Sequence, residues 1–418
     1  MKQFKHMLLS DGWWIEGDKA WFVTTKFNEL FEVTLQNNAV KYLATVPEIS
    51  GYPWRQNPMC FKYKHYIFCL PDIGKCVWRY DLLSKDWSKE KIEAEDGIRI
   101  DIHFYYPWED KCYLYSYALK SFLELDCEKN EIINSYKIAN DAEEVLAQPA
   151  LAGEYIYIPS NKNAVIYKFS LKSKVIEKID VPELESDIRS ICFDGENFHL
   201  TGNTTSVFKW NENTAKVKKI PFPQEFGVYE VLWGGETFFE NSLNRYSHST
   251  IYQIVKVGKY ICLIPFSACP ILFLNIEKDV ITAFPLKAEL ETEKTVKRGN
   301  PDKFIFAYIK EDRYIGIYSY LNEWIFEIDI IDFSCSIQSY VFSVDTLEQI
   351  EGNYLHRSVI QYESEAYKLS DAIDVLCNYV YPEGTFESEF EKLYEGSTKR
   401  SAVGQSIYSC LKEDKIYE

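Results

Sequence analysis

A short pattern of apolar and polar positions recurs along the chain. In "VWRYD" at 77–81, an apolar residue, an aromatic residue, a free position and a second apolar residue precede an acidic one. The pattern is found, with small variations, as "LFEVT" (30–34), "VWRYD" (77–81), "FLELD" (122–126), "IYKFS" (166–170), "VFKWN" (207–211), "LFLN" (272–275) and "IFEID" (325–329). Alternation of this kind is typical of strands. We therefore expect one strand at each of the seven places.

Each copy of the pattern belongs to a longer unit of apolar runs. A run that often starts with Tyr precedes it, as in "YIFCLP" from 66 and "YIYIPS" from 155, and a shorter apolar run comes before that one. A polar turn such as "SKD" and a further run follow it. Each unit thus predicts four strands, A to D, with the recurring pattern as strand C. Strand B begins about every 45 residues, apart from two longer intervals.

Repeated four-stranded units of this length are typical of a β-propeller. We predict an all-β fold, a seven-bladed β-propeller of four-stranded antiparallel blades, over residues 1–343. A single four-stranded sheet cannot bury both of its faces, whereas blades packed radially cover one another. This arrangement explains why strands B and C carry apolar residues on both faces.

One unit resembles a blade of the kelch family. In "YIFCLPDIGKCVWRYDLLSKDW" (66–87), strand C ends in Tyr80-Asp81 and strand D begins at Trp87, as is usual in kelch blades. The Gly-Gly pair that normally ends the second kelch strand is absent, and Leu70-Pro71 stands there. The WD and Gly-His signatures of WD40 blades are absent as well. The resemblance covers about 330 residues as architecture and implies blade-packing roles for Tyr80, Asp81 and Trp87, with no catalytic residue.

The C-terminal part of the chain, 344–418, departs from the repeat. Leu369, Ile373, Leu376 and Val380 are spaced three and four apart, which predicts a helix with Ser370 as its cap. Two shorter helices are expected after it. We expect this helical extension either to pack on the propeller or to serve as a docking or dimer surface.

Composition narrows the classes of partner. Aromatic residues make up 16% of the chain, which suits half-buried strands. The net charge of −17 argues against a nucleic-acid partner, because phosphate binding requires Lys and Arg. The expected partner is therefore a protein, a peptide or a glycan, with an anionic ligand as a further possibility.

Cysteine usage and apolar stretches bear on location. The eleven Cys include no C-x-x-C motif, so we expect reduced, buried thiols in a cytoplasmic protein. The N-terminal residues lack the apolar core of a signal peptide. The most apolar stretch, 260–274, is interrupted by Pro265 and Pro270 and is too short to cross a bilayer, so no membrane partner is expected.

Arginines gather in the connections that lead into strand A. These D–A connections are long, and the one at 223–251 is long enough for either a lid or an extra hairpin. Five of the nine arginines stand just before strand A of different units: Arg55, Arg99, Arg189, Arg245 and Arg298. Strand A is innermost in a propeller, so these side chains would surround the channel mouth and bind a carboxylate, phosphate, sulfate or acidic peptide. Alternatively, each Arg pairs with an acidic neighbour such as Asp101, Glu185 or Asp187 and links blades.

Two histidines stand beside these arginines. His103 and His248 precede or open strand A, where an imidazole can act as a general acid or base. The alternative is that each is only a hydrogen-bonded residue of the pore. His199 alternates with apolar residues inside strand B and is interpreted as structural.

No metal or cofactor is expected. Cys60, His65, Cys69 and Cys76 are close in sequence but are spread over three predicted strands, without the close pairs that fix zinc geometry. The chain contains no G-x-S-x-G, P-loop, H-E-x-x-H or dinucleotide-binding motif.

Two function classes follow from these observations. The first is a non-catalytic binding or scaffold propeller that recognises its partner through the face with the long loops, because function on a rigid scaffold concentrates on such loops. The alternative is a lyase, cyclase or hydrolase acting on an anionic small molecule, sugar or peptide at the channel mouth. In that case the five arginines would hold the anion and His103 or His248 would move the proton.

Overall fold

The structure is a computed structural model of the chain. It describes residues 3–4, 7–25, 28–47, 57–72, 74–92, 100–139, 146–184, 188–202, 204, 206–223, 251–265, 271–284, 304–319, 324–350 and 379–380. Residues Leu8–Thr346 form one compact unit, and Met1–Met7 with Leu347–Glu418 form another. All of the blades belong to the first unit.

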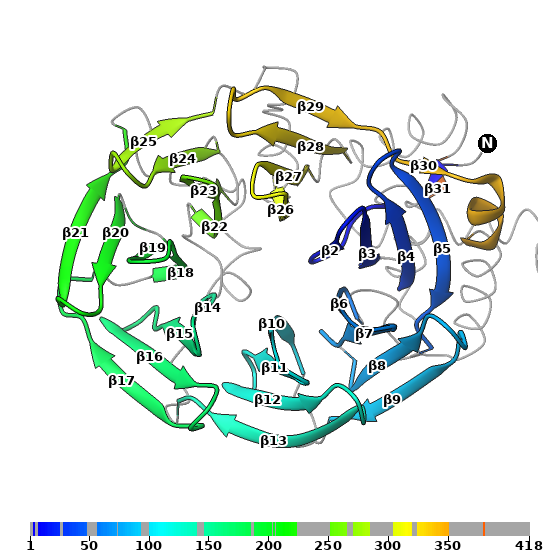
Figure 1. Ribbon diagram of the computed structural model, residues 1–418, viewed down its shortest axis with the longest axis horizontal. Helices are drawn as coiled ribbons and strands as arrows, with labels where there is room; N and C mark the ends of the chain where they lie inside the picture. Colours follow the sequence, from blue (N-terminus) through cyan, green and yellow to red (C-terminus); the bar gives the residue numbers. More distant parts are fainter. Residues whose placement is uncertain are drawn as a thin grey trace, which may run out of the picture. The chain divides into compact units, whose positions relative to one another are not determined.

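Seven antiparallel sheets follow one another around a common centre (Figure 1). Blades 1 to 4 consist of β2 (Trp14–Glu16), β3 (Lys19–Val23), β4 (Glu29–Thr34) and β5 (Ala39–Thr45); β6 (Met59–Tyr63), β7 (Tyr66–Leu70), β8 (Cys76–Asp81) and β9 (Trp87–Lys91); β10 (Ile102–Trp108), β11 (Lys111–Ser116), β12 (Ser121–Asp126) and β13 (Glu131–Lys137); and β14 (Ala150–Ala152), β15 (Tyr155–Pro159), β16 (Val165–Ser170) and β17 (Ile176–Asp180). Blades 5 to 7 consist of β18 (Ile188–Phe193), β19 (Phe198–Gly202), β20 (Ser206–Asn211) and β21 (Lys216–Pro221); β22 (Ile251–Val257), β23 (Tyr260–Pro265), β24 (Leu272–Asn275) and β25 (Val280–Ala283); and β26 (Phe304–Lys310), β27 (Tyr314–Ser319), β28 (Trp324–Asp329) and β29 (Cys335–Gln338). The predicted seven-bladed propeller is confirmed, with strand A innermost in each blade and strand D outermost in blades 2 to 7.

The residue that ends the recurring pattern shapes the turn between strands C and D. In blade 2, Oδ1 of Asp81 accepts hydrogen bonds from the backbone N–H groups of Leu83 (2.7 Å) and Ser84 (3.3 Å). Four residues after Asp81, Lys85 has a left-handed backbone conformation with φ of 64°. A left-handed residue stands at this position in every blade: Asn38, Lys85, Asn130, Lys174, Ala215, Asp279 and Phe333. The repeat therefore encodes one turn geometry, which sets the register of each outer hairpin.

Tyr80 and Trp87 pack in the blade rather than lining a site. Tyr80 is buried, and its ring centroid lies 4.9 Å from that of Trp87. Its hydroxyl donates a hydrogen bond to the backbone oxygen of Leu43 in blade 1, at 3.4 Å. These residues thus join neighbouring blades, as the sequence pattern predicted.

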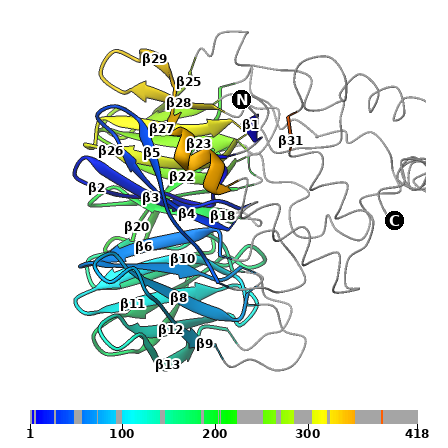
Figure 2. The same ribbon diagram turned by 90° about the vertical axis from the view of Figure 1, so that its right-hand side faces the viewer.

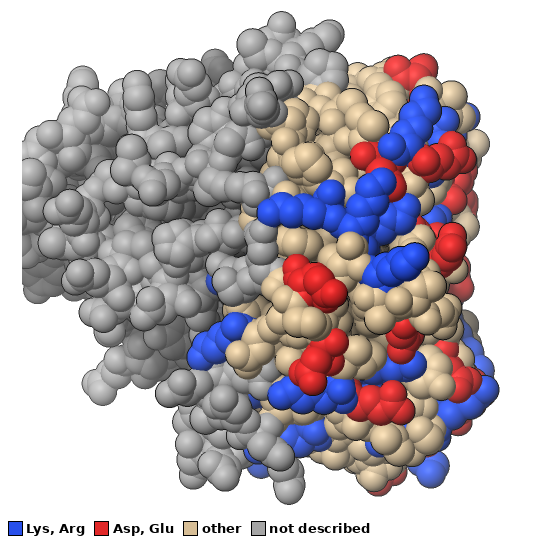
Figure 3. Space-filling model, turned by 90° about the vertical axis from the view of Figure 1, so that its left-hand side faces the viewer, with Lys and Arg blue, Asp and Glu red and all other residues tan. Residues whose placement is uncertain are grey.

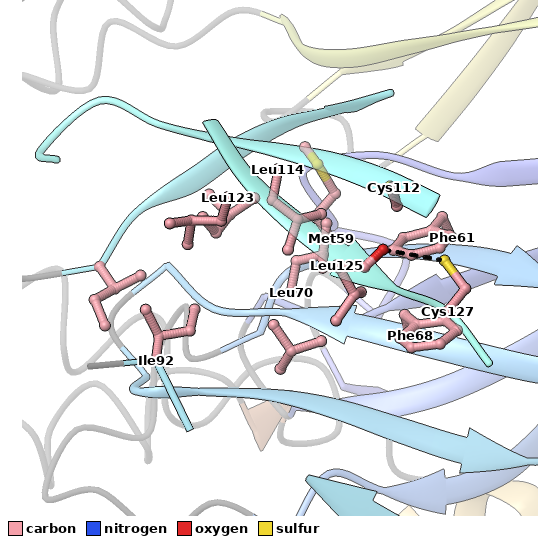
Figure 4. Packing of buried hydrophobic residues seen from close by; sticks show 13 residues of the cluster. Met59, Phe61, Phe68, Leu70, Ile92, Cys112, Leu114, Leu123, Leu125 and Cys127 are labelled. Atoms are coloured by element: carbon pink, nitrogen blue, oxygen red, sulfur yellow. Dashed lines mark hydrogen bonds between the residues drawn. The ribbon is translucent and has the colours of Figure 1, made fainter. Parts of the chain in front are cut away.

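Apolar side chains fill the space between neighbouring blades. Figure 4 shows this between blades 2 and 3, where Phe61, Phe68 and Leu70 face Leu114 and Leu125. Each of these five side chains is fully buried. Burial of one such side chain stabilises the fold by about 1.5–3 kcal/mol. The faces of the sheets, rather than one central core, therefore supply most of the apolar burial.

At the opposite end from the B–C connections, a C–D turn reaches across to the preceding blade. The turn of blade 5 presents Glu212, which accepts hydrogen bonds from Tyr157 (2.6 Å) and Lys168 (2.7 Å) of blade 4. The turn of blade 6 presents Asp279 to Lys209 of blade 5 at 2.9 Å. On the outer side formed by β17, β21 and β25, Lys and Arg are interleaved with Asp and Glu (Figure 3). Glu212 and Asp279 of these C–D turns therefore link each blade to the one before it.

Strands A to D of the first and last blades each come from one stretch of chain, and two contacts close the ring between these blades. Blade 1 is built from residues 14–45 and blade 7 from residues 304–338. Trp13 stacks on Phe22 of blade 1 (centroids 4.6 Å apart) and on Tyr308 of blade 7 (5.5 Å). Outside this stack, β30 (Val341–Phe342) adds to β5 as a parallel fifth strand of blade 1. Aromatic stacking and a short parallel strand thus close the seam.

The predicted C-terminal helices lie mostly outside the described residues. Residues 344–350 are helical. The helical spacing predicted through Val380 is wrong at its end, because β31 (Tyr379–Val380) pairs antiparallel with β1 (Gln3–Phe4), shown in Figure 2. A strand is possible there because Tyr and Val both favour β-structure. In the part of the chain that the structure describes, no helix is long and apolar enough to span a membrane.

Candidate functional site

Two of the seven predicted site residues belong to the described ranges, His103 and Arg189. Each is the second residue of an innermost strand, β10 or β18, at the end of the ring where strands B lead into strands C. The others lie outside the described residues: Arg55, Arg99, Arg245, Arg298 and His248. The arginine ring therefore stays a prediction.

His103 is an inserted residue in its strand. The pairing of β10 with β11 passes from Ile102 opposite Ser116 to Phe104 opposite Tyr115, so His103 has no residue opposite it. Such a β-bulge bends the strand and redirects the side chain of the extra residue, and bulges are frequent beside functional sites.

Arg189 occupies the same position in blade 5. Here the pairing of β18 with β19 passes from Ile188 opposite Gly202 to Ser190 opposite Thr201, which leaves Arg189 as the inserted residue. The strands β22 and β26 carry irregularities near their starts as well. Irregularities of pairing thus recur at the same end of several blades. His103 and Arg189 occupy equivalent positions in two of them. The sequence pattern located both residues without revealing the bulges.

The imidazole of His103 lies between two carboxylates. Its Nε2 is 3.9 Å from Oδ1 of Asp72 and 3.8 Å from Oδ2 of Asp101. The Asp72 side chain is fully buried and that of Asp101 nearly so, whereas 20% of the His103 side chain is exposed. The ring of Tyr117 lies against the imidazole, with centroids 5.0 Å apart. We call these four residues the His103 corner.

The His103 corner is built across the seam between blades 2 and 3. The backbone N–H of Ile102 donates a hydrogen bond to the oxygen of Pro71, at 2.8 Å, which brings Asp72 beside the start of β10. Asp101 is fixed by its own blade, because its Oδ1 accepts hydrogen bonds from Ser116 Oγ (3.2 Å) and from the N–H of Ala118 (2.8 Å). Its other oxygen therefore remains directed to His103.

The predicted ion pair between Asp101 and a neighbouring arginine stays a prediction, because Arg99 lies outside the described residues. Within the described residues the Asp101 carboxylate contacts His103, Ser116 and Ala118. Asp72 was not selected from the sequence at all. A single Asp in the B–C connection of the previous blade gives no local signal of this contact.

The backbone of Arg189 links blades 4 and 5. Its oxygen accepts a hydrogen bond from the N–H of Gln148 at 3.0 Å, and Gln148 pairs in parallel with Ser190. The side chain is partly buried. The position of Arg189 is therefore set by the joint between two blades.

His199 lies inside blade 5, as predicted for a structural residue. It is fully buried, and its Nε2 is 2.7 Å from Oδ2 of Asp194. Burial acts to raise the pKa of Asp194, but hydrogen bonds from His199 and from the N–H groups of Asn197 and Glu196 outweigh it and hold that pKa far below its usual value.

The cysteines of blade 2 belong to the core. Cys60, Cys69 and Cys76 are buried, and burial raises the pKa of the Cys60 thiol to about 12. His65 is paired instead with Asp81, at 3.8 Å. Within the described ranges, no group of three or more His, Cys, Asp and Glu side chains is arranged to hold a metal ion.

Known proteins resemble this chain in fold. No protein-family model and no curated protein sequence matches it. Among solved structures, virginiamycin B lyase from Staphylococcus aureus matches with a TM-score of 0.54 at 9% identity, over 77% of this chain and 95% of the lyase. A putative 6-phosphogluconolactonase from Bacteroides uniformis matches with a TM-score of 0.52 at 10% identity, over 78% of this chain and 96% of that protein. One chain of a mitotic checkpoint complex matches with a TM-score of 0.51 at 10% identity, over 82% of this chain and 91% of that one.

These likenesses bear on the fold alone. The matched proteins are a lyase, a putative lactonase and a component of a multiprotein complex, and identity near 10% transfers none of these activities. They do not single out the kelch family. What they show, together with the structure, is that the chain is a seven-bladed β-propeller.

Proposed function

We propose that this protein is a non-catalytic binding propeller that recognises a protein, peptide or glycan at the end of the ring formed by the B–C and D–A connections. The observation that carries this proposal is the shared position of His103 and Arg189. Both are bulge residues at the start of an innermost strand, at the same end of the ring. The fold thus places chemically different side chains at equivalent positions of different blades. Such side chains offer one ligand several kinds of contact.

The opposite end of the ring supports the same choice of face. There the turns are short, and charged residues such as Glu212 and Asp279 are hydrogen-bonded to the neighbouring blade. Side chains already held in such contacts are less available to a partner. The long connections lie at the other end, with the bulge residues.

A ligand screen followed by thermal unfolding tests the proposal. A library of acidic, basic and neutral small molecules and short peptides is screened for compounds that raise the unfolding temperature, since a ligand that binds the folded state stabilises it. The stabilisation should be lost in His103→Ala or Arg189→Ala. His65→Ala and Arg313→Ala are matched controls, because they change the same residue types in A–B turns at the opposite end. Ligands that stabilise all four variants equally would contradict the proposed face.

The second candidate is an enzyme that uses the same face. Its specific support is the placement of a partly exposed imidazole beside Asp72 and Asp101, because carboxylates can orient a histidine for proton transfer. Such an enzyme would be a lyase, cyclase or hydrolase in which His103 gives or takes a proton. Turnover of lactone, ester or glycoside substrates that falls by about 10²-fold or more in His103→Ala would favour this candidate. Turnover unchanged in that variant would exclude His103 from the chemistry.

A further inference from the structure

Two cysteines face each other in the inner hairpin of blade 2. Cys60 of β6 and Cys69 of β7 are direct partners in the antiparallel register. Residues opposite each other in neighbouring strands carry their side chains on the same face of the sheet. Both thiols are free and fully buried, and both belong to the apolar cluster between blades 1 and 2. The fold therefore brings two thiols together inside one blade.

The turn between β6 and β7 determines which kind of pair these cysteines form. Tyr63 and Tyr66 are partners on either side of a two-residue turn, so they exchange backbone hydrogen bonds with each other. Hydrogen-bonded and non-hydrogen-bonded pairs alternate along an antiparallel ladder. Three pairs farther along, Cys60 and Cys69 are therefore a non-hydrogen-bonded pair, whose Cα atoms are typically about 4.5 Å apart. A disulfide joins Cα atoms about 4.4–6.8 Å apart, so the bond can close with little movement of the backbone.

Among the described strands, this arrangement is specific to blade 2. Cys112 of β11 and Cys262 of β23 stand in strand B of blades 3 and 6, and they are as buried as Cys69. Their direct partners are Pro107, Leu125, Val255 and Phe273. A buried cysteine in strand B is thus shared with blades 3 and 6, but in the described strands only blade 2 places a second cysteine opposite it.

Burial controls how the pair can react. The Cys60 thiol donates a hydrogen bond to the backbone oxygen of Trp21 in blade 1, at 3.4 Å. Burial raises the pKa of Cys60 to about 12, and burial together with the nearby Cys60 raises the pKa of Cys69 well above its usual value. Since the thiolate is the reactive form, oxidation of the folded protein is slow and proceeds through local opening of the blade. Once one sulfur is oxidised, however, the second lies directly opposite it.

From this register we propose that Cys60 and Cys69 form a redox-sensitive pair, which closes a disulfide when the protein is exposed to a peroxide. One thiol first reacts with hydrogen peroxide: an S–O bond forms, the O–O bond breaks, and water leaves. The second sulfur then attacks the sulfur of this sulfenic acid: the S–S bond forms, the S–O bond breaks, and a second water leaves. The two thiols have lost two electrons and two protons, and the peroxide has become two water molecules.

The disulfide connects the start of β6 to the end of β7, at the end of the ring where the B–C connections lie. Oxidation therefore fastens the innermost hairpin of blade 2 next to the proposed binding face. The inference goes beyond the proposed function, and it holds whether that face binds a partner or catalyses a reaction.

Peptide mapping of the oxidised full-length protein tests this inference. Trypsin releases Cys60, Cys69 and Cys76 on separate peptides, 56–62, 65–75 and 76–79. The folded protein is treated with hydrogen peroxide, the remaining thiols are alkylated in urea, and the digest is analysed by mass spectrometry without a reducing agent. Peptides 56–62 and 65–75 should be linked, with a combined mass lower by two hydrogen atoms, and dithiothreitol should separate them.

Other cysteines serve as controls within the same protein. Cys112 and Cys262 should form no disulfide, because they are equally buried and lack a cysteine opposite them. Cys60→Ala should abolish the linked product without creating a link between Cys69 and Cys76. This variant is accepted only if its far-ultraviolet circular dichroism matches that of the wild type; the mapping of the wild type needs no variant.

Three outcomes would overturn the inference. Exposure to peroxide is continued, in urea below the unfolding transition where necessary, until the equally buried Cys262 begins to be oxidised; the absence of the link by then is the first. The second is a link from Cys60 or Cys69 chiefly to Cys76, because the register would then not select the pair. The third is a link that forms as selectively in the unfolded protein, because the fold would then not be responsible. None of them bears on the proposed function, which the ligand screen tests separately.

Discussion

Lys174 of blade 4 holds Glu124 of blade 3, with Nζ 3.3 Å from Oε1. Lys174 also donates a hydrogen bond to the hydroxyl of Tyr113, which itself donates to Oε1 of Glu124 at 3.0 Å. The other carboxylate oxygen accepts hydrogen bonds from Tyr136 (2.5 Å) and Asn134 (3.2 Å). Burial acts to raise the pKa of Glu124, but these hydrogen bonds together lower it. One carboxylate thus organises a seam between blades.

Replacing Lys174 should weaken this seam. Lys174→Ala removes a charged donor from a nearly buried carboxylate, and we expect the unfolding free energy to fall by about 1.5 kcal/mol. Lys85→Ala is the control, because Lys85 has the same turn position and the same left-handed backbone, with φ of 64° against 63°. Its effect should stay within about 0.5 kcal/mol. Urea unfolding measures both; equal losses would show that the turn, rather than the contact to Glu124, is responsible.

The Asp194–His199 pair should make stability depend on acid pH. The folded-state pKa of Asp194 is lowered, so its carboxylate stabilises the fold above the unfolded-state pKa of about 3.9. That stabilisation is lost as the pH falls from about 5 toward the folded-state pKa. Wild type should therefore be more stable than Asp194→Asn at pH 7, and the difference should shrink steadily below pH 5. Urea titrations from pH 7 to pH 3 test this; a difference that does not change with pH would contradict it.

Glycine at the left-handed turn position should act in opposite directions in two blades. Ala215 in blade 5 is exposed and has φ of 53°, so Ala215→Gly should raise the unfolding free energy by about 0.5–1 kcal/mol. Phe333 in blade 7 has φ of 56°, but its ring lies 5.2 Å from Phe273 and 5.3 Å from Tyr260 of blade 6. Phe333→Gly should lower the unfolding free energy, because the loss of the aromatic contacts outweighs the relief of strain in the left-handed backbone. Thermal unfolding of both variants decides; stabilisation in both would mean that the Phe333 ring adds little.

The closing seam should be sensitive to shape as well as to size. Trp13→Ala should lower the unfolding free energy by about 3–5 kcal/mol, as expected for a large buried aromatic residue. A Cβ at Gly316 would lie 2.1 Å from the ring of Tyr308, so Gly316→Ala should cost about 1–3 kcal/mol by displacing the stack. Gly12→Ala is the control, because the nearest atom to its Cβ would be Cε of Met59, at 3.9 Å. If Gly316→Ala and Gly12→Ala unfold alike in urea, the stack does not depend on the close approach to Gly316.

The fold could be predicted because its strongest signals are local. The residues of 77–81 specify a strand, a packing aromatic residue and a polar residue that closes the next turn. The chain repeats this pattern seven times, with Asp, Asn, Ser or Thr as the last residue. Tyr80 and Trp87 accordingly pack in the blade as expected, whereas Asp81 accepts hydrogen bonds within the C–D turn instead of packing. The propeller fold could be predicted because the pattern repeats, although no single strand would have identified it.

The site could be predicted only in part, because it depends on register and on neighbouring blades. His103 and Arg189 were found from their place before strand A, but a bulge is a shift between two strands and leaves no mark in either one alone. Asp72 and His103 are 31 positions apart and meet only when blade 2 packs on blade 3. Phe22 and Tyr308, the two residues between which Trp13 stacks, are almost three hundred positions apart in the chain, and no periodic pattern predicts their contact with Trp13.

In this ring the four strands A to D of every blade come from one continuous stretch of chain, and a short strand that follows blade 7 is added to blade 1. When blades at the two ends exchange strands, a gain or loss of one unit during evolution must preserve the matching halves at both termini. Here the four strands A to D of blade 1 and of blade 7 are each encoded by one uninterrupted stretch, and what must fit at the seam are the surfaces around Trp13 and the pairing of β30 with β5. Tandem duplication of a unit of about 45 residues would then insert a whole blade and leave every existing sheet intact. After such a duplication, the residues of the closing seam, rather than those inside the blades, would have to change.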